Sequence, residues 1–167
     1  WGVPMSSEVG LTVTEMLKAV ETGKVRCLYV IGENPMTSDP DLNHVREALQ
    51  KTEFIVLQEI FPSETAQYAD VVLPAASWAE KEGTFTNTER RIQRVRRAVP
   101  PPGQARLDSW IVAELAKRLI ALGAATPDAD APYADWAYES PEDVMAEINA
   151  LTPIYAGVTY GRLNAGV

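Results

Sequence analysis

The chain has a single cysteine, Cys27, and a single histidine, His44, among its 167 residues. One residue of each kind cannot build a disulfide framework or a thiolate or imidazole metal site. A Ser–His–Asp triad would have to use His44, which falls near the start of a predicted surface helix, where a solvated side chain is expected. Cys27 falls within a mainly apolar run in a predicted strand, which is typical of a buried, inert thiol. The sequence therefore predicts no catalytic residues and no metal ligands in this chain.

Basic residues and long apolar runs are also scarce. Lys and Arg together number 15 against 23 Asp and Glu, a net charge of -8. So acidic a chain repels phosphate backbones, and we expect no nucleic-acid partner. No apolar run approaches the ~20 residues of a membrane-spanning helix, so no direct membrane insertion is expected. Because the chain begins at Trp1 rather than Met, we interpret it as part of a longer protein. A cytoplasmic location is expected, with a periplasmic one left open because a targeting signal could precede Trp1.

The first half of the chain alternates between helical and strand periodicity. In chain order the pattern predicts a helix over 12–23, a strand over 25–31 and a second helix capped by Asp39 or Asp41. This second helix buries Leu42, Val45 and Leu49. A strand over 54–57, a short helix over 63–69 and a strand over 71–73 follow. Thr12 and Glu15 have the spacing of a capping box at the first helix. This order predicts an α/β fold with three layers, in which a mainly parallel sheet has helices on both faces, as in Rossmann-like dinucleotide folds.

The second half is less regular. Ile92 and Val95 are the only large apolar residues among the five arginines of residues 84–99, so we predict an extended edge segment rather than a helix. We expect its five arginines to pair with carboxylates of the chain or with another domain. They are Arg90, Arg91, Arg94, Arg96 and Arg97. A helix capped by Asp108, an exposed loop over 124–140 and a helix over 140–151 follow. We expect an irregular lead-in over 1–10, one α/β domain over 11–151, and a connecting tail over 152–167.

Three turns follow the predicted parallel strands, where open α/β sheets bind their ligands. They are Gly32–Pro35, Gln58–Ile60 and Pro74–Ser77. Gly32 permits close backbone approach, Asn34 and Gln58 can donate to and accept from a nucleobase or ribose, and Ser38 suits a phosphate. On the pattern alone, the plainer interpretation of a good turn and a polar strand end is favoured. Glu80 and Glu82 could form an acid–base pair, but solvated or ion-paired carboxylates are more common.

Residues 65–80, TAQYADVVLPAASWAE, resemble a signature of the prokaryotic molybdopterin oxidoreductases. The signature combines small residues, an aspartate, two apolar residues, Leu-Pro, more small residues and a glutamate at fixed spacing. Residues 82–93 continue it, and residues 29–35, YVIGENP, resemble the family's guanine-nucleotide-binding segment. The similarity extends from about Leu11 to Tyr160. Residues 86–91, TNTERR, and the closing residues 153–160, PIYAGVTY, most resemble the formate dehydrogenase α subunit.

This resemblance implies a catalytic subunit of four domains that binds two molybdopterin guanine dinucleotides around one molybdenum or tungsten. The chain resembles the third domain, which grips the guanosine end of one cofactor. The cofactor-binding residues implied are Gly32, Asn34, Pro35, Ser38, Gln58, Glu59, Ile60 and, near the pyrophosphate, Ala75. Asn34 departs from the aspartate of some relatives.

The whole enzyme would oxidise formate to CO2 and pass two electrons to iron–sulfur centres, beginning with a 4Fe-4S cluster outside this chain. The implied partners are the remaining domains of the subunit and iron–sulfur electron-transfer subunits. Because the metal ligand is absent, this chain alone is expected to be inactive, and whether it holds cofactor by itself is left open. The alternatives are the same domain of a nitrate reductase or of a respiratory-complex relative that has lost its pterin, and a self-standing α/β binding module without a redox role.

Overall fold

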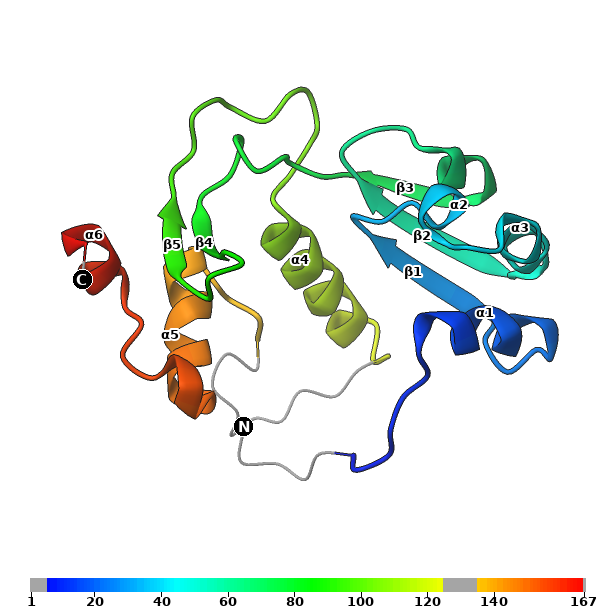
Figure 1. Ribbon diagram of the computed structural model, residues 1–167, viewed down its shortest axis with the longest axis horizontal. Helices are drawn as coiled ribbons and strands as arrows, with labels where there is room; N and C mark the ends of the chain where they lie inside the picture. The colour runs from blue at the N-terminus through cyan, green and yellow to red at the C-terminus, as the bar shows by residue number, and fades with distance from the viewer. Residues whose placement is uncertain (1–5, 125–134, 167) are drawn as a thin grey trace. The chain divides into compact units, whose positions relative to one another are not determined.

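The computed structural model describes residues 6–124 and 135–166. The chain divides between Ala75 and Ala76 into two compact units, whereas the sequence predicted one domain over 11–151. Figure 1 shows the elements of each unit, which are described separately below.

The unit over Ser6–Ala75 is built around a parallel sheet of three strands, in the order β1-β2-β3. The strands are β1 (Cys27–Ile31), β2 (Phe54–Glu59) and β3 (Val71–Pro74), and the helices are α1 (Val13–Glu21), α2 (Pro35–Ser38), α3 (Leu42–Lys51) and the 3-10 helix η1 (Glu64–Tyr68). The α/β class and the parallel sheet are therefore confirmed. The strand predicted from residue 25 begins at Cys27 instead.

Local signals position these helices as the sequence predicted. The backbone N–H of Thr12 donates to Oε2 of Glu15 at 2.7 Å, which completes the capping box of α1. At α3, the side chain of Asp41 accepts from the N–H of His44 at 3.1 Å, so Asp41 rather than Asp39 is the cap. A side-chain acceptor at this position satisfies one of the N–H groups that a helix start leaves unpaired.

One face of the sheet carries the core of this unit. Leu17 and Val20 from α1 and Val45 and Leu49 from α3 pack together with Ile55 of β2. Val45 and Ile55 have no exposed surface. His44 lies beside this packing, with its side chain 24% exposed and its Nδ1 3.5 Å from Oε1 of Glu21. The expectation of a solvated His44 was therefore wrong, because the ring lies between α1 and α3.

The alternate residues of the strands point to the opposite face, which we call the open face because several of its side chains are exposed. Its exposed side chains include Cys27, Tyr29, Ile31, Phe54 and Val71. The prediction of a buried Cys27 was therefore wrong. Side chains alternate along β1, so Cys27 points to the open face and Leu28 faces the core.

The unit that begins at Ala76 contains a separate antiparallel hairpin and three α-helices. Its elements are β4 (Gly83–Thr86), β5 (Ile92–Val95), α4 (Asp108–Ala121), α5 (Pro141–Leu151), the 3-10 helix η2 (Pro153–Tyr155) and α6 (Tyr160–Ala165). The extended conformation predicted for 84–99 is confirmed in β4 and β5, although they pair with each other and not with the parallel sheet. The turn between them is closed by Asn87. Its carbonyl accepts from the N–H of Arg90, and its side-chain Oδ1 accepts from the N–H of Arg91.

The helix starts of this unit agree with the sequence in one case and differ in another. Ser140 and Asp143 form a capping box at the start of α5, where the sequence predicted a helix. Asp108 was predicted to cap α4, but it is the first helical residue, after Leu107, and its carboxylate pairs with Nζ of Lys81. Of the loop predicted over 124–140, residues 125–134 lie outside the described residues.

The segment 152–167 was predicted to be a connecting tail without periodicity; the structure contains η2 and α6 within it, and its connecting role stays a prediction. The guanidinium carbon of Arg94 lies 3.8 Å from the ring centroid of Tyr160, and Nη2 of Arg96 donates to Oδ1 of Asn164 at 2.8 Å. These contacts tie α6 to β5. A helix of six residues is too short to show periodicity in the sequence. Over residues 6–124 and 135–166, no helix has the length and apolarity needed to cross a membrane.

Candidate functional site

The carboxyl edge of the parallel sheet brings the predicted cofactor-binding segments together. The register places Ile31 beside Gln58 and Gln58 beside Leu73. The N–H of Gly32 donates to the carbonyl of Gln58 at 2.9 Å, and the N–H of Ala75 donates to the carbonyl of Glu59 at 3.1 Å. Segments 15 to 27 residues apart in the sequence are therefore neighbours, as the parallel order predicted.

Gly32 shapes the first turn of this edge. Its φ is +60°, which L side chains rarely adopt, and a Cβ added to it would meet no atom within 4 Å. The backbone conformation therefore requires glycine, and the space beside it is open to a ligand.

The side chain of Asn34, predicted to contact the cofactor, joins this turn to η1. Its Nδ2 donates to Oε2 of Glu64 at 2.7 Å, and its Oδ1 accepts from Oγ1 of Thr65 at 2.7 Å. Thr65 is fully buried, and its hydroxyl also accepts from the N–H of Met36 at 3.5 Å. Both ends of the Asn34 amide are thus engaged inside the protein, and its main effect is to fix the shape of the turn.

The next two predicted residues form part of α2, a helix of only four residues. Pro35 is its first residue, a position that needs no N–H donor. Ser38 is its last, and its hydroxyl donates to the carbonyl of Asn34 at 3.2 Å. Ser38 is exposed, but it does not stand at a helix N-terminus where backbone N–H groups would converge on a phosphate.

The Gln58 side chain is fully buried, and its Oε1 accepts from the hydroxyl of Tyr29. A ligand at the edge would therefore contact Gly32, and Glu59 and Ile60 at the end of β2, before it reached the Gln58 side chain. Glu59 is partly buried, and its Oε1 accepts from the N–H of Ile60 at 2.6 Å. The Ile60 side chain is 44% exposed. Tyr29 and Thr65 form hydrogen bonds to two of the predicted site residues, and the sequence did not single them out because their partners lie about 30 residues away.

The charge of this edge is negative. Glu33, Glu59 and Glu64 follow β1 and β2, and the pKa of Glu64 is lowered because the Asn34 amide donates a hydrogen bond to its carboxylate. The basic residues of the same unit are all elsewhere in its sequence, at Lys18, Lys24, Arg26, Arg46 and Lys51. Such an edge suits the hydrogen-bond donors of a base or ribose better than it suits a phosphate.

The Asn34–Glu64 bond gives a direct test of this arrangement. We expect Asn34→Ala to raise the pKa of Glu64 towards its ordinary value, because the donor that stabilises the ionised form is removed. A group whose pKa is lowered by folding adds stability above its unfolded pKa and loses that contribution as the pH falls through its folded pKa. The variant should therefore lose this acidic pH dependence.

The measurement is a carbon-detected NMR titration of the Glu64 carboxyl group. Glu15 is the internal control, because its pKa is lowered by hydrogen bonds from Thr12 and should not move. An unchanged Glu64 titration in Asn34→Ala would contradict the assignment of Asn34 as the donor.

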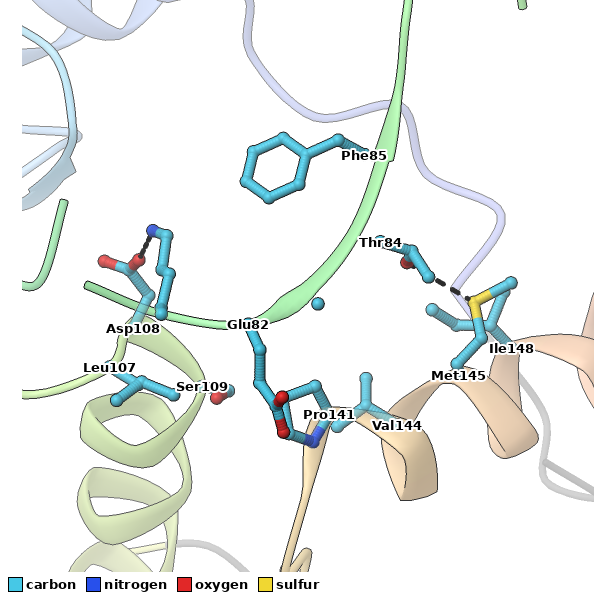
Figure 2. Close-up of a pocket in the computed structure, with 12 residues that line it drawn as sticks. Glu82, Thr84, Phe85, Leu107, Asp108, Ser109, Pro141, Val144, Met145 and Ile148 are labelled. Atoms are coloured by element: carbon cyan, nitrogen blue, oxygen red, sulfur yellow. Dashed lines mark hydrogen bonds and ion pairs between the residues drawn. The ribbon is translucent and has the colours of Figure 1, made fainter. Parts of the chain in front are cut away.

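A second hollow, of about 240 Å³, lies in the other unit among β4, the start of α4 and α5 (Figure 2). It is lined by Lys81, Glu82, Gly83, Thr84, Phe85, Leu107, Asp108, Ser109, Pro141, Val144, Met145 and Ile148. Oγ1 of Thr84 lies 3.7 Å from Sδ of Met145, and Lys81 is neutralised by Asp108. The sequence missed this pocket because three distant segments build it.

The Glu80–Glu82 pair, considered from the sequence as an acid–base couple, is used structurally. Oε2 of Glu80 accepts from the N–H of Ser77 at 2.8 Å, and Oε2 of Glu82 lies 3.7 Å from Nη2 of Arg94. Within the described ranges, no group of three or more His, Cys, Asp or Glu side chains could hold a metal ion.

Comparison with known proteins agrees with the family resemblance. The model of the molybdopterin oxidoreductase family matches residues 5–118. An F420-dependent formate dehydrogenase subunit alpha of Methanocaldococcus jannaschii is 48% identical over 98% of this chain and 22% of its own length. A probable oxidoreductase of Bacillus subtilis, YjgC, is 47% identical over 98% of this chain and 15% of its own length.

Among solved structures, acetylene hydratase from Pelobacter acetylenicus matches with a TM-score of 0.63 and 20% identity, over 79% of this chain and 17% of that one. This last likeness supports the fold alone. The chain belongs to the molybdopterin oxidoreductase family. It spans 22% and 15% of the length of the two curated relatives named above. A further relative, an F420-dependent formate dehydrogenase 1 subunit alpha of Methanococcus maripaludis, is 49% identical over 98% of this chain and 22% of its own length.

Proposed function

We propose that the Ser6–Ala75 unit binds the guanosine part of a molybdopterin guanine dinucleotide at the carboxyl edge of its sheet, within a formate dehydrogenase α subunit. The observation that carries the proposal is the convergence of Gly32, Glu59 and Ala75 at one edge through the hydrogen bonds to Gln58 and Glu59. The supporting family is that of the molybdopterin oxidoreductases, and the supporting relatives are the formate dehydrogenase subunits.

The chemistry of the edge fits a guanosine. Guanine presents N–H donors at the edge where adenine presents an acceptor, and carboxylates such as Glu59 accept from such donors in charge-assisted hydrogen bonds. The open space beside Gly32 admits a ring or ribose close to the backbone. Asn34, Thr65 and Glu64 hold the turn that forms one wall. Ala75, at 6% exposure, can contribute backbone contact only.

In the proposed whole enzyme, the molybdenum or tungsten of the bound cofactor supplies the two-electron chemistry that oxidises formate to CO2. This chain's residues do not take part in that step. They hold one end of a long cofactor in a repeatable position, and positioning of this kind lowers the entropic cost of reaching the reactive geometry. The proposed partners are the remaining domains of the subunit and iron–sulfur electron-transfer subunits, and a nearby 4Fe-4S cluster would receive the electrons.

The proposal is tested by NMR titration of the chain with GMP and with AMP. We expect shifts confined to the backbones of 32–38 and 58–60 and larger with GMP, with a dissociation constant near 1 mM, which corresponds to about 4 kcal/mol. Glu59→Gln should reduce the preference for GMP because the charged acceptor is lost.

The matched control is Glu53→Gln, an exposed glutamate beside Arg26 at the opposite end of β2. It should leave both titrations unchanged. Equal shifts for GMP and AMP, or shifts gathered on the arginines of 90–97, would contradict the proposed site.

A further inference from the structure

The β4–β5 hairpin carries a charge pattern unlike that of the rest of the chain. The net charge of the whole chain is -8, yet residues 84–99 contain five arginines, one glutamate and no lysine. Arg94 alone among these arginines is mostly buried, at 11% side-chain exposure, where it packs on Tyr160 beside Glu82. Arg90, Arg91, Arg96 and Arg97 are exposed.

No carboxylate in the part of the chain that the structure describes neutralises these exposed arginines. Among the described residues, no carboxylate forms an ion pair with Arg90, Arg91, Arg96 or Arg97 within 4.0 Å. Arg96 donates to the neutral side chain of Asn164. Within residues 6–124 and 135–166, the expected pairing with the chain's own carboxylates is therefore seen for Arg94 alone, and pairing of the others with another domain stays a prediction.

The two faces of the hairpin differ. Thr84 and Arg94 are cross-strand partners, and they point towards Met145 and Tyr160 of the helices that follow. Phe85 and Gln93 are the next pair and occupy the other face, where both are exposed. Figure 2 shows the Phe85 ring pointing away from Thr84 and Met145. Phe85 is nevertheless one of the residues that line the pocket.

We propose that this face of the hairpin and the adjoining pocket dock an acidic protein segment that presents an apolar side chain flanked by carboxylates. The pocket of about 240 Å³ has mainly apolar walls, including Leu107, Val144 and Ile148, and its cation Lys81 is already paired with Asp108. Its occupant is therefore apolar. The arginines at both ends of β5 then receive the flanking carboxylates.

The composition favours a protein rather than a phosphate ligand. Arginine and aromatic residues are enriched in protein interfaces, whereas lysine is depleted there. Arg91 and Arg96 stand at opposite ends of β5, about 16 Å apart along an extended strand, which is too far for one phosphate to bridge. A long polyanion would meet repulsion from the acidic remainder of the chain, whereas charges on a short segment are screened beyond about 8–10 Å.

The test uses this chain and a fluorescein-labelled peptide in which one phenylalanine is flanked on each side by two acidic residues. We expect saturable binding in fluorescence anisotropy, weakened by added salt. Arg91→Glu combined with Arg97→Glu should weaken it about tenfold or more, since two attractions become repulsions. Neither arginine belongs to the proposed nucleotide edge, so this docking surface stands or falls independently of that site.

The matched control combines Arg46→Glu with Arg118→Glu, which makes the same charge change at two exposed arginines elsewhere and should leave binding unchanged. A peptide with alanine in place of phenylalanine should bind more weakly because the pocket stays empty. Three results would overturn the proposal: no binding at about 1 mM peptide, equal binding by the alanine peptide, or tighter binding of tripolyphosphate or a single-stranded oligonucleotide than of the peptide.

Discussion

Ile55→Ala should lower the free energy of unfolding of the Ser6–Ala75 unit by about 2–5 kcal/mol, the usual range for truncating a fully buried isoleucine. Ile55 has no exposed surface and packs between the residues of α1 and α3 that form the core. The alanine would leave a cavity because β2 is the central strand and is held on both sides. A loss of this size is a large part of the stability of an ordinary domain.

The measurement is amide hydrogen exchange in β1 and β2, which reports the opening of this unit even though the chain has two units. Ile154→Ala is the control, because Ile154 is 85% exposed and its truncation should change exchange little. If Ile55→Ala left exchange in the sheet as slow as it is in the parent chain, the assignment of this core would be wrong.

Thr65→Val should destabilise the same unit by about 1–3 kcal/mol, although the two side chains have nearly the same shape. The hydroxyl of Thr65 donates to Asn34 and accepts from the N–H of Met36, and the residue is fully buried. Valine would leave both groups without this partner in a place that water does not reach. The turn over 32–35 would lose its tie to η1, so GMP binding should weaken as well.

Thr37→Val is the control for this substitution. Thr37 lies in the same segment, but it is exposed, and its hydroxyl donates to the carbonyl of Asn34 at 3.1 Å at the surface. It should cost no more than a few tenths of a kcal/mol. Equal effects of the two substitutions on hydrogen exchange and GMP binding would show that the buried link between the turn and η1 does not position the site.

The two proposals concern different parts of the chain and fail separately. The nucleotide edge depends on Gly32 and Glu59 in the parallel-sheet unit, and its loss would show in the GMP titration. The acidic-segment surface depends on Phe85 and on exposed arginines that flank β5, such as Arg91 and Arg97, and its loss would show in peptide anisotropy. A chain that bound the peptide and no nucleotide would retain the interaction surface and lose the cofactor assignment.

Several errors of sequence interpretation arose because tertiary packing, and not the type of the neighbouring residues, decides which side chains are covered. Cys27 and His44 have neighbours that are typical of a buried strand and of a surface helix, respectively. Cys27 is nevertheless exposed, because alternation assigns it to the open face, and His44 is largely covered by packing near Glu21. The predicted tail lacked periodicity because α6 is short, and its position depends on a contact between Arg94 and Tyr160, 66 residues apart.

The sequence alone determined the features that arise within about ten residues. They include the capping boxes at Thr12 and Ser140, the glycine turn after β1, the alternation that leads to a parallel sheet, and the motif spacing that indicates the family. Backbone hydrogen bonding, side-chain caps and periodicity act over such distances, so their signals lie in neighbouring residues.

Only the tertiary structure decided how distant polar groups are used. It showed that the amide of Asn34 is bound to Glu64 and Thr65, that Gln58 is buried behind Tyr29, and that the chain divides after Ala75. The physical reason is that one polar side chain can satisfy its hydrogen bonds with a ligand, with water or with the protein itself. The choice depends on which groups the folded chain brings within about 3 Å, and that is set by strand register and packing across some 30 residues of sequence.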